Sequence, residues 1–386
     1  MRKIFIFIGS RANYASIKSA LIHIKKNRKL KLFIVLGASA VISKYGNLEK
    51  IMKVDGFNIY RKIFFLLEGE NPTTMAKSTG LGLIELTSII EEIKPDIALT
   101  VGDRFETMAT TLASAYMNVP LAHTMGGEVS GTIDESIRHA VTKFANIHFP
   151  ASKKAAERIL KLGEDKRSIF HVGCPRLDLI KTMIKKEKIT EFNKRIFKDG
   201  VGDFIDLQKP FLLISQHPVT TEYDKTARDF LRTLKAIEKV GIQSIFLWPN
   251  ADAGSGKIAL KIRQWREGQK KIKSHFFKNL PAEDYIRLMD KTSCLVGNSS
   301  SGIRDAGYIG TPVVNVGSRQ NGRERGPNVI DCKNNSLEIY DAIIFQLKQK
   351  KYQSNSIYGD GKSGKRIASV LANLKNLKTQ KKLFFD

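Results

Sequence analysis

The amino-acid sequence predicts an α/β protein with two doubly wound domains, each built on a parallel sheet. Short apolar runs, typical of buried strands, alternate with segments of helical periodicity. The same alternation starts again after about residue 205. The chain has 386 residues, 42% of them hydrophobic, and is therefore too long for one ordinary core.

The first domain is expected over residues 1–185. The apolar runs KIFIFIG (3–9), KLFIVLG (31–37) and ALTVGD (98–103) predict strands, and RANYASIKSALIHIKK (11–26) predicts a helix. The first run predicts a strand rather than a secretory signal, because it is too short and is followed by a turn and an amphipathic segment.

The second domain is expected over residues 205–364, with strands at PFLLISQ, SIFLWPN, CLVGNSS and TPVVNVG. The charged stretch before it predicts a linker with a surface helix. The helical pattern in residues 365–386 is expected to pack back on the first domain. Two such domains facing each other would line a central cleft with the carboxyl ends of their strands.

The composition restricts the expected partners. The formal net charge of +26 suggests a nucleic-acid or anionic-membrane partner. The lysines, however, are spread through helical segments without interleaved aromatic residues, which favours solvated helix faces and no nucleic-acid partner. No run approaches the ~20 apolar residues that span a bilayer, so we expect no membrane partner.

The cysteine and histidine patterns predict neither a disulfide scaffold nor a metal site. Cys174, Cys294 and Cys332 are odd in number and far apart, which favours a reducing compartment, the bacterial-type cytoplasm. The seven histidines are scattered without metal-ligand spacing. There is also no P-loop and no GxSxG nucleophile motif.

Polar groups gather within residues 100–150, where two predicted strands end. The first of these strands ends on Asp103 and the second on His123, which is followed by MGGE (125–128). Open α/β sheets bind ligands at the carboxyl ends of their strands. The chemistry is therefore expected here, with Asp103 as the first candidate.

A predicted helix beginning near residue 133 adds two charged pairs. Asp134 and Arg138 are four residues apart, as are Glu135 and His139. The simpler explanation is two ordinary helix pairs with acids in the first turn. Their position directly after GGE favours a group of carboxylates that supplies both an acid and a base.

A phosphate site is one interpretation of GNSSSG (297–302), which follows a predicted strand and begins a helix. Free backbone N–H groups and serine hydroxyls at a helix start bind anions. Simple capping by Ser299 or Ser300 has about equal weight. Arg319 and Arg323 would neutralise a diphosphate, although arginines at surface turns are equally common.

Three further residues follow predicted strands. His217 comes directly after PFLLISQ, where a ligand contact or proton carrier and a structural histidine are equally plausible. Asn250 ends SIFLWPN in the same way. Arg11 follows the first strand and is by itself a weak signal.

Six longer motifs, in this order, closely resemble the hydrolysing UDP-N-acetylglucosamine 2-epimerases of sialic-acid and legionaminic-acid biosynthesis. The resemblance runs from the first strand to the YGDG segment and so covers nearly the whole chain. The motifs are GDRFETMA, GGEVSGTIDESIRHAVTK, QHPVTTEY, WPNADAG, GNSSSGIRDAGYIGTPVVNVGSRQNGRE and IYGDGK.

The resemblance implies a GT-B-like fold of two Rossmann-like domains, the second of which binds the nucleotide. It implies elimination of UDP across C1 and C2 of the sugar to give a 2-acetamidoglucal. Addition of water with inversion at C2 then releases an N-acetylmannosamine-type sugar. It further implies a nucleotide-sugar substrate, no cofactor or metal, and a homodimer or homotetramer.

The resemblance also assigns roles to residues. Asp103 and Asp134 match catalytic carboxylates, and Arg138 follows at the family's spacing. The positions that match nucleotide contacts are Arg11, His217, Asn250, Ser299, Ser300, Asp305 and Arg319.

Five positions depart from the family's pattern. Met125 stands where sialic-acid members commonly have a catalytic glutamate, and a thioether carries no proton. Asn13 replaces an acid, Ser16 replaces a lysine, and Ser39 falls near an expected histidine. Asp305 replaces the glutamate that holds the ribose.

Three hypotheses are consistent with these changes. The first is a hydrolysing epimerase for a modified sugar, such as a 2,4-diacetamido-trideoxy hexose, in which Glu128 or His123 takes part of the missing proton transfer. The second is a GT-B glycosyltransferase or nucleotide-sugar lyase. The third is a catalytically altered nucleotide-sugar-binding protein. Retention of Asp103, Asp134 and Arg138 favours the first.

Overall fold

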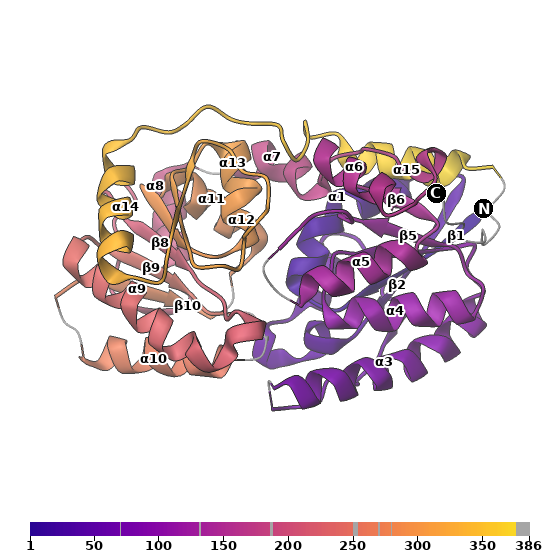
Figure 1. Ribbon diagram of the computed structural model, residues 1–386, viewed down its shortest axis with the longest axis horizontal. Helices are drawn as coiled ribbons and strands as arrows, with labels where there is room; N and C mark the ends of the chain where they lie inside the picture. Colours follow the sequence, from indigo (N-terminus) through magenta and orange to yellow (C-terminus); the bar gives the residue numbers. More distant parts are fainter. Residues whose placement is uncertain are drawn as a thin grey trace. The chain divides into compact units, whose positions relative to one another are not determined.

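The structure is a computed structural model that describes residues 1–69, 71–130, 133–185, 188–249, 254–268, 271–278 and 280–375. The chain forms two compact units. Unit 1 comprises Met1–Glu128, Ile133–Leu179 and Tyr358–Asp386, and unit 2 comprises Val129–Thr132 and Ile180–Ile357. Each unit has one sheet flanked by helices, so the predicted α/β class with two doubly wound domains is confirmed (Figure 1).

Unit 1 contains a parallel sheet in the order β3-β2-β1-β4-β5-β6. Its strands are β1 (Arg2–Ile8), β2 (Leu30–Leu36), β3 (Arg61–Lys62), β4 (Ile97–Val101), β5 (Leu121–Thr124) and β6 (Ile147–Phe149). Its α-helices are α1 (Arg11–Lys26), α2 (Leu48–Val54), α3 (Pro72–Ile93), α4 (Phe105–Tyr116), α5 (Asp134–Phe144), α6 (Lys153–Lys161) and α15 (Ser363–Asn373). Its 3₁₀ helices are Ala38–Val41, Ser43–Tyr45, Lys166–Ser168 and Pro175–Leu179.

The strands of this sheet are added first on one side of β1 and later on the other, so the strand order reverses between β1 and β4. Strands β2 and β3 extend the sheet on one side of β1, whereas β5 and β6 extend it on the other side of β4. Ligands of doubly wound sheets bind outside the carboxyl ends of the strands at such a switch point. The expected binding region of unit 1 is therefore the turn after β1, which leads to Arg11 at the start of α1, together with the turn after β4, which contains Asp103.

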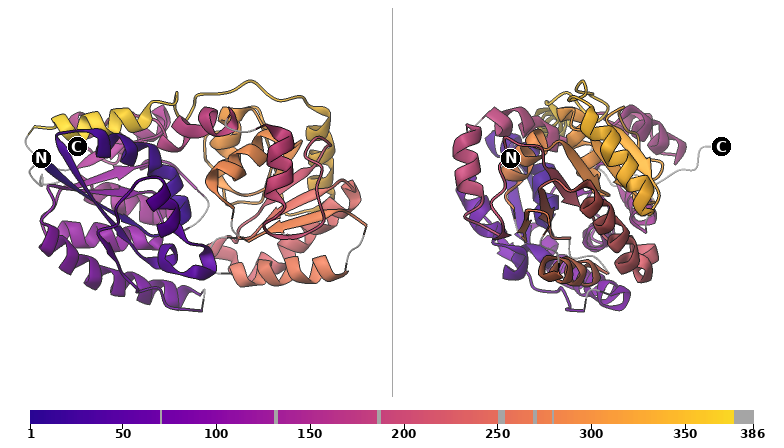
Figure 2. Two further views of the ribbon diagram at one scale, coloured as in Figure 1. Left: turned by 180° about the vertical axis from the view of Figure 1, so that it is seen from behind. Right: turned by 90° about the vertical axis from the view of Figure 1, so that its left-hand side faces the viewer.

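The C-terminal helix α15 belongs to unit 1 and packs along α1, as the yellow and indigo ribbons show (Figure 2). The two helices approach so closely that a Cβ atom on Gly364 would lie 2.4 Å from Ser19 Oγ. The Asp178 carboxylate accepts hydrogen bonds from the backbone N–H groups of Ser363 and Gly364, at 3.0 and 2.7 Å. The start of α15 is therefore fixed by unit 1.

Unit 2 contains a sheet in the order β13-β12-β11-β8-β9-β10-β7, parallel except for the edge pair β10–β7. Its strands are β7 (Val201–Gly202), β8 (Leu212–Ser215), β9 (Ser244–Leu247), β10 (Ser274–Phe277), β11 (Cys294–Gly297), β12 (Val313–Val316) and β13 (Val329–Cys332). Its α-helices are α7 (Ile180–Lys185), α8 (Ile189–Ile196), α9 (Thr226–Val240), α10 (Ser255–Gly268), α11 (Ala282–Lys291), α12 (Ser300–Ile303), α13 (Asp305–Ile309) and α14 (Ser336–Lys348), and Thr220–Lys225 is a 3₁₀ helix. The switch point lies between β8 and β11.

Residues 180–204, expected to end the first domain and form a linker, belong to unit 2. In α8, Phe192 and Ile196 lie one helical turn apart and are buried in the core of unit 2. The carbonyl of Met183 in α7 accepts a 2.9 Å hydrogen bond from Arg287 Nε. Ile189, at the start of the same helix, also packs against this core, so a highly charged helix still presents a buried apolar face. Within the described ranges, no helix combines the length and apolar character that a bilayer crossing needs.

Candidate functional site

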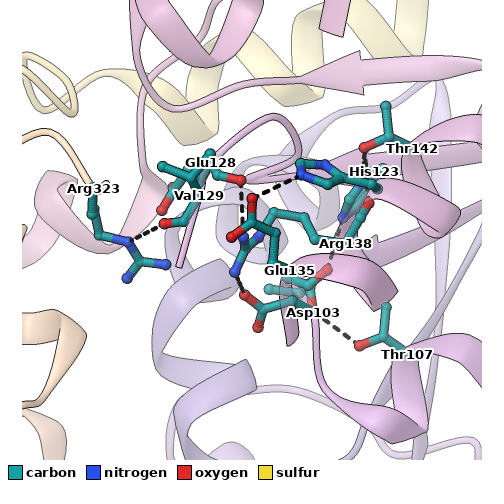
Figure 3. Close-up of polar contacts among 12 residues, drawn as sticks. Asp103, Thr107, His123, Glu128, Val129, Glu135, Arg138, Thr142 and Arg323 are labelled. Atoms are coloured by element: carbon teal, nitrogen blue, oxygen red, sulfur yellow. Dashed lines mark hydrogen bonds and ion pairs between the residues drawn. The ribbon is translucent and has the colours of Figure 1, made fainter. Parts of the chain in front are cut away.

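A partly buried ion pair lies at the end of β4. Asp103 is the second residue after this strand, and its carboxylate accepts a hydrogen bond from Arg138 Nη2 on α5 (Figure 3). The Arg138 side chain is 1% exposed, whereas that of Asp103 is 25% exposed. Arg138 therefore holds the carboxylate from the buried side and leaves part of it exposed.

The Arg138 guanidinium is surrounded by acidic groups. Its Nη1 atom donates a 2.8 Å hydrogen bond to the backbone carbonyl of Glu128. Burial alone would lower the pKa of Arg138, but the charges of Asp103, Glu128 and Asp134 outweigh burial and raise that pKa. Glu128 is 3% exposed, and Asp134 is the first residue of α5. Three carboxylates thus act on one buried cation.

The second predicted pair on α5 lies nearer to solvent. Glu135 Oε1 is 3.3 Å from His139 Nε2, and the two side chains are 34% and 30% exposed. Figure 3 shows Glu135 between Glu128 and Asp103. The pair has the spacing of an ordinary helix contact, which was the simpler explanation for it.

His123 lies in β5 and is fully buried. Its Nε2 atom is 2.8 Å from the carbonyl oxygen of Gly102, which only accepts hydrogen bonds, so Nε2 carries the proton. Burial lowers the pKa of His123 to about 4. The imidazole is therefore neutral at pH 7 and orients the turn before Asp103. This geometry favours a positioning role over proton transfer.

The loop after β1 is joined to the end of β4 by Asn13. The Asn13 Oδ1 atom accepts from the N–H of Gly9 at 3.2 Å, and its Nδ2 donates to the carbonyl of Val101 at 3.3 Å. An aspartate at this position has no donor for Val101, which accounts for the asparagine here. Arg11, the first residue of α1, is partly exposed beside this bridge.

The sequence did not single out Glu106, which the structure places at the same switch point. Its side chain is 1% exposed and its Oε1 atom is 2.7 Å from Arg104 Nε. A Cβ atom on Gly9 would lie 2.5 Å from Glu106 Cγ, so only glycine fits at the end of β1. The available signal was the acid in GDRFE, at the start of a helix after Asp103.

Met125 occupies an apolar environment beside the β4 turn. It is 7% exposed and has a left-handed backbone φ of 63°. The Cys174 Sγ atom lies 3.9 Å from Met125 Sδ. A Cβ atom on Gly102 would lie 3.7 Å from the terminal methyl group of Met125. The position is thus filled by sulfur and methyl contacts.

In unit 2, His217 and Asn298 join the two strands of the switch point. The N–H of His217 donates to Asn298 Oδ1 at 2.7 Å, and Asn298 Nδ2 donates to the carbonyl of His217 at 2.9 Å. The Asn298 carbonyl also accepts from Arg319 Nη1 at 3.2 Å and from Gln320 Nε2 at 2.8 Å. The predicted residues His217 and Arg319 both contact Asn298 and therefore lie together at the carboxyl ends of β8 and β11.

The GNSSSG segment begins two short helices, α12 and α13, rather than the single expected helix. Ser299 caps α12, because its hydroxyl accepts a 3.4 Å hydrogen bond from the N–H of Ser301. Ser299 and Ser300 are partly exposed at the switch point. Asp305 is fully buried in α13, so its carboxylate presents no surface to a ligand in this structure. The predicted residue Asn250 lies outside the described residues.

A pocket beside His217 encloses about 360 Å³ of space, part of it open to solvent. Within the described part of the chain, Gln216 Oε1 and Thr226 Oγ1 are buried and have no hydrogen-bond partner. The lining is mostly polar and suits a hydroxyl-bearing ligand. The lining residues are Gln216, His217, Pro218, Val219, Glu222, Thr226, Asp229, Ile258, Asn298, Val316, Ser318 and Asn334.

The described ranges contain no group of three or more His, Cys, Asp or Glu residues able to hold a metal ion.

Comparisons with known proteins match this architecture. The family model described as UDP-N-acetylglucosamine 2-epimerase matches residues 23–372. The UDP-N,N'-diacetylbacillosamine 2-epimerase (hydrolyzing) of Legionella pneumophila is 34% identical over 97% of this chain and 96% of that protein. The GDP/UDP-N,N'-diacetylbacillosamine 2-epimerase (hydrolyzing) of Campylobacter jejuni is 31% identical over 92% and 89% of the two chains. The UDP-GlcNAc 2-epimerase of Methanocaldococcus jannaschii, solved with UDP-GlcNAc and UDP, has a similar fold, with a TM-score of 0.80, 19% identity, and coverage of 96% and 99%.

Proposed function

We propose that this chain, which belongs to the UDP-N-acetylglucosamine 2-epimerase family, is a hydrolysing 2-epimerase of a UDP-linked 2-acetamido sugar. The proposed products are UDP and a free N-acetylmannosamine-type sugar, as used for sialic-acid-type or legionaminic-acid-type sugars. The observation that carries the proposal is the Asp103–Arg138 pair at the switch point of unit 1, with Glu128 and Asp134 beside it.

The proposed reaction has two steps. In the first, a base removes the proton from C2 while the bond from C1 to the UDP oxygen breaks, which leaves a 2-acetamidoglucal. In the second, water adds its hydroxyl group to C1 and gives its other proton to a base, while an acid returns a proton to C2 from the opposite face. Inversion at C2 therefore requires one proton-transfer group on each face of the sugar. Asp103 and Asp134 are proposed for these roles, and Arg138 orients the Asp103 carboxylate.

Glu128 is proposed to supply the proton transfer that Met125 does not. It is a carboxylate three residues after Met125, and its peptide carbonyl is held by Arg138. His123 is proposed as a positioning residue, because it is neutral and bonded to Gly102. Of the two residues that the sequence left open for this proton transfer, Glu128 is therefore proposed and His123 is not.

The nucleotide is proposed to bind at the switch point of unit 2. Partly exposed serine hydroxyls and the Arg319 guanidinium at the end of β11 suit a diphosphate. The proposed contacts are His217, Ser299, Ser300 and Arg319, together with Arg11 of unit 1 and Asn250. Asp305 is proposed to contact the ribose, which requires its buried carboxylate to become exposed when the nucleotide binds.

The sugar is proposed to be a 2,4-diacetamido-trideoxy hexose, with UDP-N-acetylglucosamine as the second candidate. The support is that two relatives above 30% identity are named as diacetylbacillosamine 2-epimerases. The chain is also proposed to be a cytoplasmic homodimer or homotetramer. Exposed apolar side chains of Leu81 and Ile84 on α3 and of Tyr116 on α4 support self-association, which light scattering of the purified protein measures.

Product analysis in deuterated water tests the function. The protein is incubated with UDP-N-acetylglucosamine and with its 4-acetamido-6-deoxy relative. The proposal predicts free UDP and a manno-configured sugar deuterated at C2, and no turnover by Asp103→Asn. UDP release only with an added acceptor sugar would indicate a glycosyltransferase instead. Binding without turnover, with affinity unchanged in Asp103→Asn, would indicate a binding protein.

A further inference from the structure

A loop of unit 2 fixes the residue that follows Glu128 in the chain. Arg323 is 6% exposed, and its Nε atom donates a 3.4 Å hydrogen bond to the carbonyl of Val129 (Figure 3). The preceding residue, Gly322, has a φ of +74° and packs against Val129, since a Cβ atom there would lie 3.0 Å from Val129 Cγ2. Val129 belongs to the short 129–132 piece of unit 2. Gly322 and Arg323, which are neighbours in the chain, thus both contact Val129.

The same loop is anchored at the proposed phosphate site. It follows β12 and spans residues 317–326. Arg319 Nη1 and Gln320 Nε2 both donate to the carbonyl of Asn298, directly before Ser299. Arg325 Nε donates a 3.0 Å hydrogen bond to the carbonyl of Arg323. The loop therefore has a defined shape from its phosphate-site anchor to Val129.

Consecutive peptide carbonyls are held by two different buried arginines. Arg138 binds the carbonyl of Glu128 at 2.8 Å, and Arg323 binds that of Val129. Each hydrogen bond restricts the rotation of its peptide plane. The plane held by Arg138 joins Glu128 to Val129, and the plane held by Arg323 is the next one, so the two together restrict both planes around the Val129 Cα atom. The direction of the Glu128 side chain depends on this backbone.

We propose that Arg323 is a positioning residue that couples an occupied phosphate site at Asn298–Ser300 to the orientation of Glu128. This proposal rests on the proposed function, because it takes Glu128 as a proton-transfer group. A diphosphate bound at Ser299 and Arg319 stabilises the conformation of loop 317–326. Because Arg323 in this loop binds the carbonyl of Val129, the Val129 backbone is then held more firmly as well. This positioning role differs from the diphosphate contact that the sequence suggested, and it uses the hydrogen bond from Arg323 Nε to Val129.

Two independent variants disturb the contact. Arg323→Lys keeps the charge but loses the planar guanidinium. Gly322→Ala presses on Val129, and adding Val129→Ala removes the Cγ2 atom that it meets. Gly241→Ala is the matched control, because Gly241 has a φ of +75° and open space around it, so it has the same backbone strain without the contact.

Hydrogen exchange of peptides spanning residues 123–130 tests the contact without any need for turnover. With UDP as the probe, exchange in the wild type is expected to slow about tenfold. Arg323→Lys and Gly322→Ala are expected to lose this slowing, the Val129→Ala/Gly322→Ala pair to regain most of it, and Gly241→Ala to keep it. UDP-dependent slowing that survives in both Arg323→Lys and Gly322→Ala would overturn the coupling.

Kinetics distinguish a positioning role from ligand binding. Arg323→Lys is expected to lower kcat about tenfold with little change in the UDP dissociation constant. A tenfold weaker UDP affinity with unchanged kcat would instead make Arg323 a diphosphate ligand and refute the proposal. If the wild type turns over no UDP-sugar while the exchange pattern holds, the proposed function fails and the coupling stands.

Discussion

His123 provides a quantitative test of the electrostatics around Asp103. The imidazole is fully buried in β5, and burial lowers its pKa from 6.5 to about 4. His123→Gln removes the titrating ring but keeps an N–H donor for the carbonyl of Gly102. Comparing the two proteins across pH isolates the contribution of this one group to stability.

The expected magnitude follows from proton linkage. Because the folded-state pKa of His123 is depressed, the unfolded chain takes up this proton first as the pH falls. The contribution is therefore complete above about pH 6.5 and is lost as the pH falls toward 4. The pKa difference of about 2.5 units corresponds to roughly 3 kcal/mol in total, of which roughly 2 kcal/mol is lost between about pH 7.5 and pH 5.

The measurement must report on unit 1. Both tryptophans, Trp248 and Trp265, lie in unit 2, so their fluorescence does not follow the unit that contains His123. Hydrogen exchange of the β5 peptide in a urea series at each pH does. The wild type is expected to lose about 2 kcal/mol more than His123→Gln between about pH 7.5 and pH 5. Parallel pH profiles would refute the buried neutral imidazole and with it the positioning role.

Three further predictions concern other parts of the site. Met125→Glu places a carboxyl group against the Cys174 thiol, where burial raises the pKa of that carboxyl group. The free energy of unfolding of the variant is therefore expected to match that of the wild type at low pH and to fall by about 1–3 kcal/mol as the pH rises to neutral. An equal loss at both pH values in urea unfolding would contradict this. Arg319→Ala should weaken UDP binding about tenfold in calorimetry, and unchanged affinity would remove Arg319 from the nucleotide site. Gly9→Ala should cost about 1–3 kcal/mol by displacing Glu106, whereas a stability equal to that of the wild type would show that the close approach is absent.

The strands of both sheets were predictable where their apolar runs are continuous. The run KIFIFIG became β1, and RANYASIKSALIHIKK became α1 over the same residues, 11–26. The short strands β6 and β10 were missed, because His148 interrupts the apolar run of the first and Ser274 and His275 begin the second, so neither stands out by periodicity. The charged segment 180–204 was assigned to a linker because its buried apolar residues, such as Ile180, Phe192 and Ile196, alternate with many charged ones.

The site was predictable to the extent that it follows strand ends. Asp103 and His217 follow the carboxyl ends of β4 and β8, and Arg138 lies on the predicted helix, since parallel strands present their carboxyl ends together. The sequence did not indicate that His123 points inward or that Asp305 is buried, because both depend on packing between distant segments. The partners of Arg323 were also unreadable, because Val129 is 194 residues away in the chain.

The arrangement around Arg138 bears on whether Met125 marks a lost activity. The carboxylates of Asp103, Glu128 and Asp134 together raise the pKa of one buried guanidinium, that of Arg138, against the opposing effect of its burial. An ion pair with a buried partner contributes little net stability. Met125 itself holds a left-handed backbone that is costly for a residue other than glycine. A protein that only binds a nucleotide needs neither feature, whereas a proton-transfer site needs several carboxylates close together. The group of acids therefore supports the proposed proton transfer through Glu128.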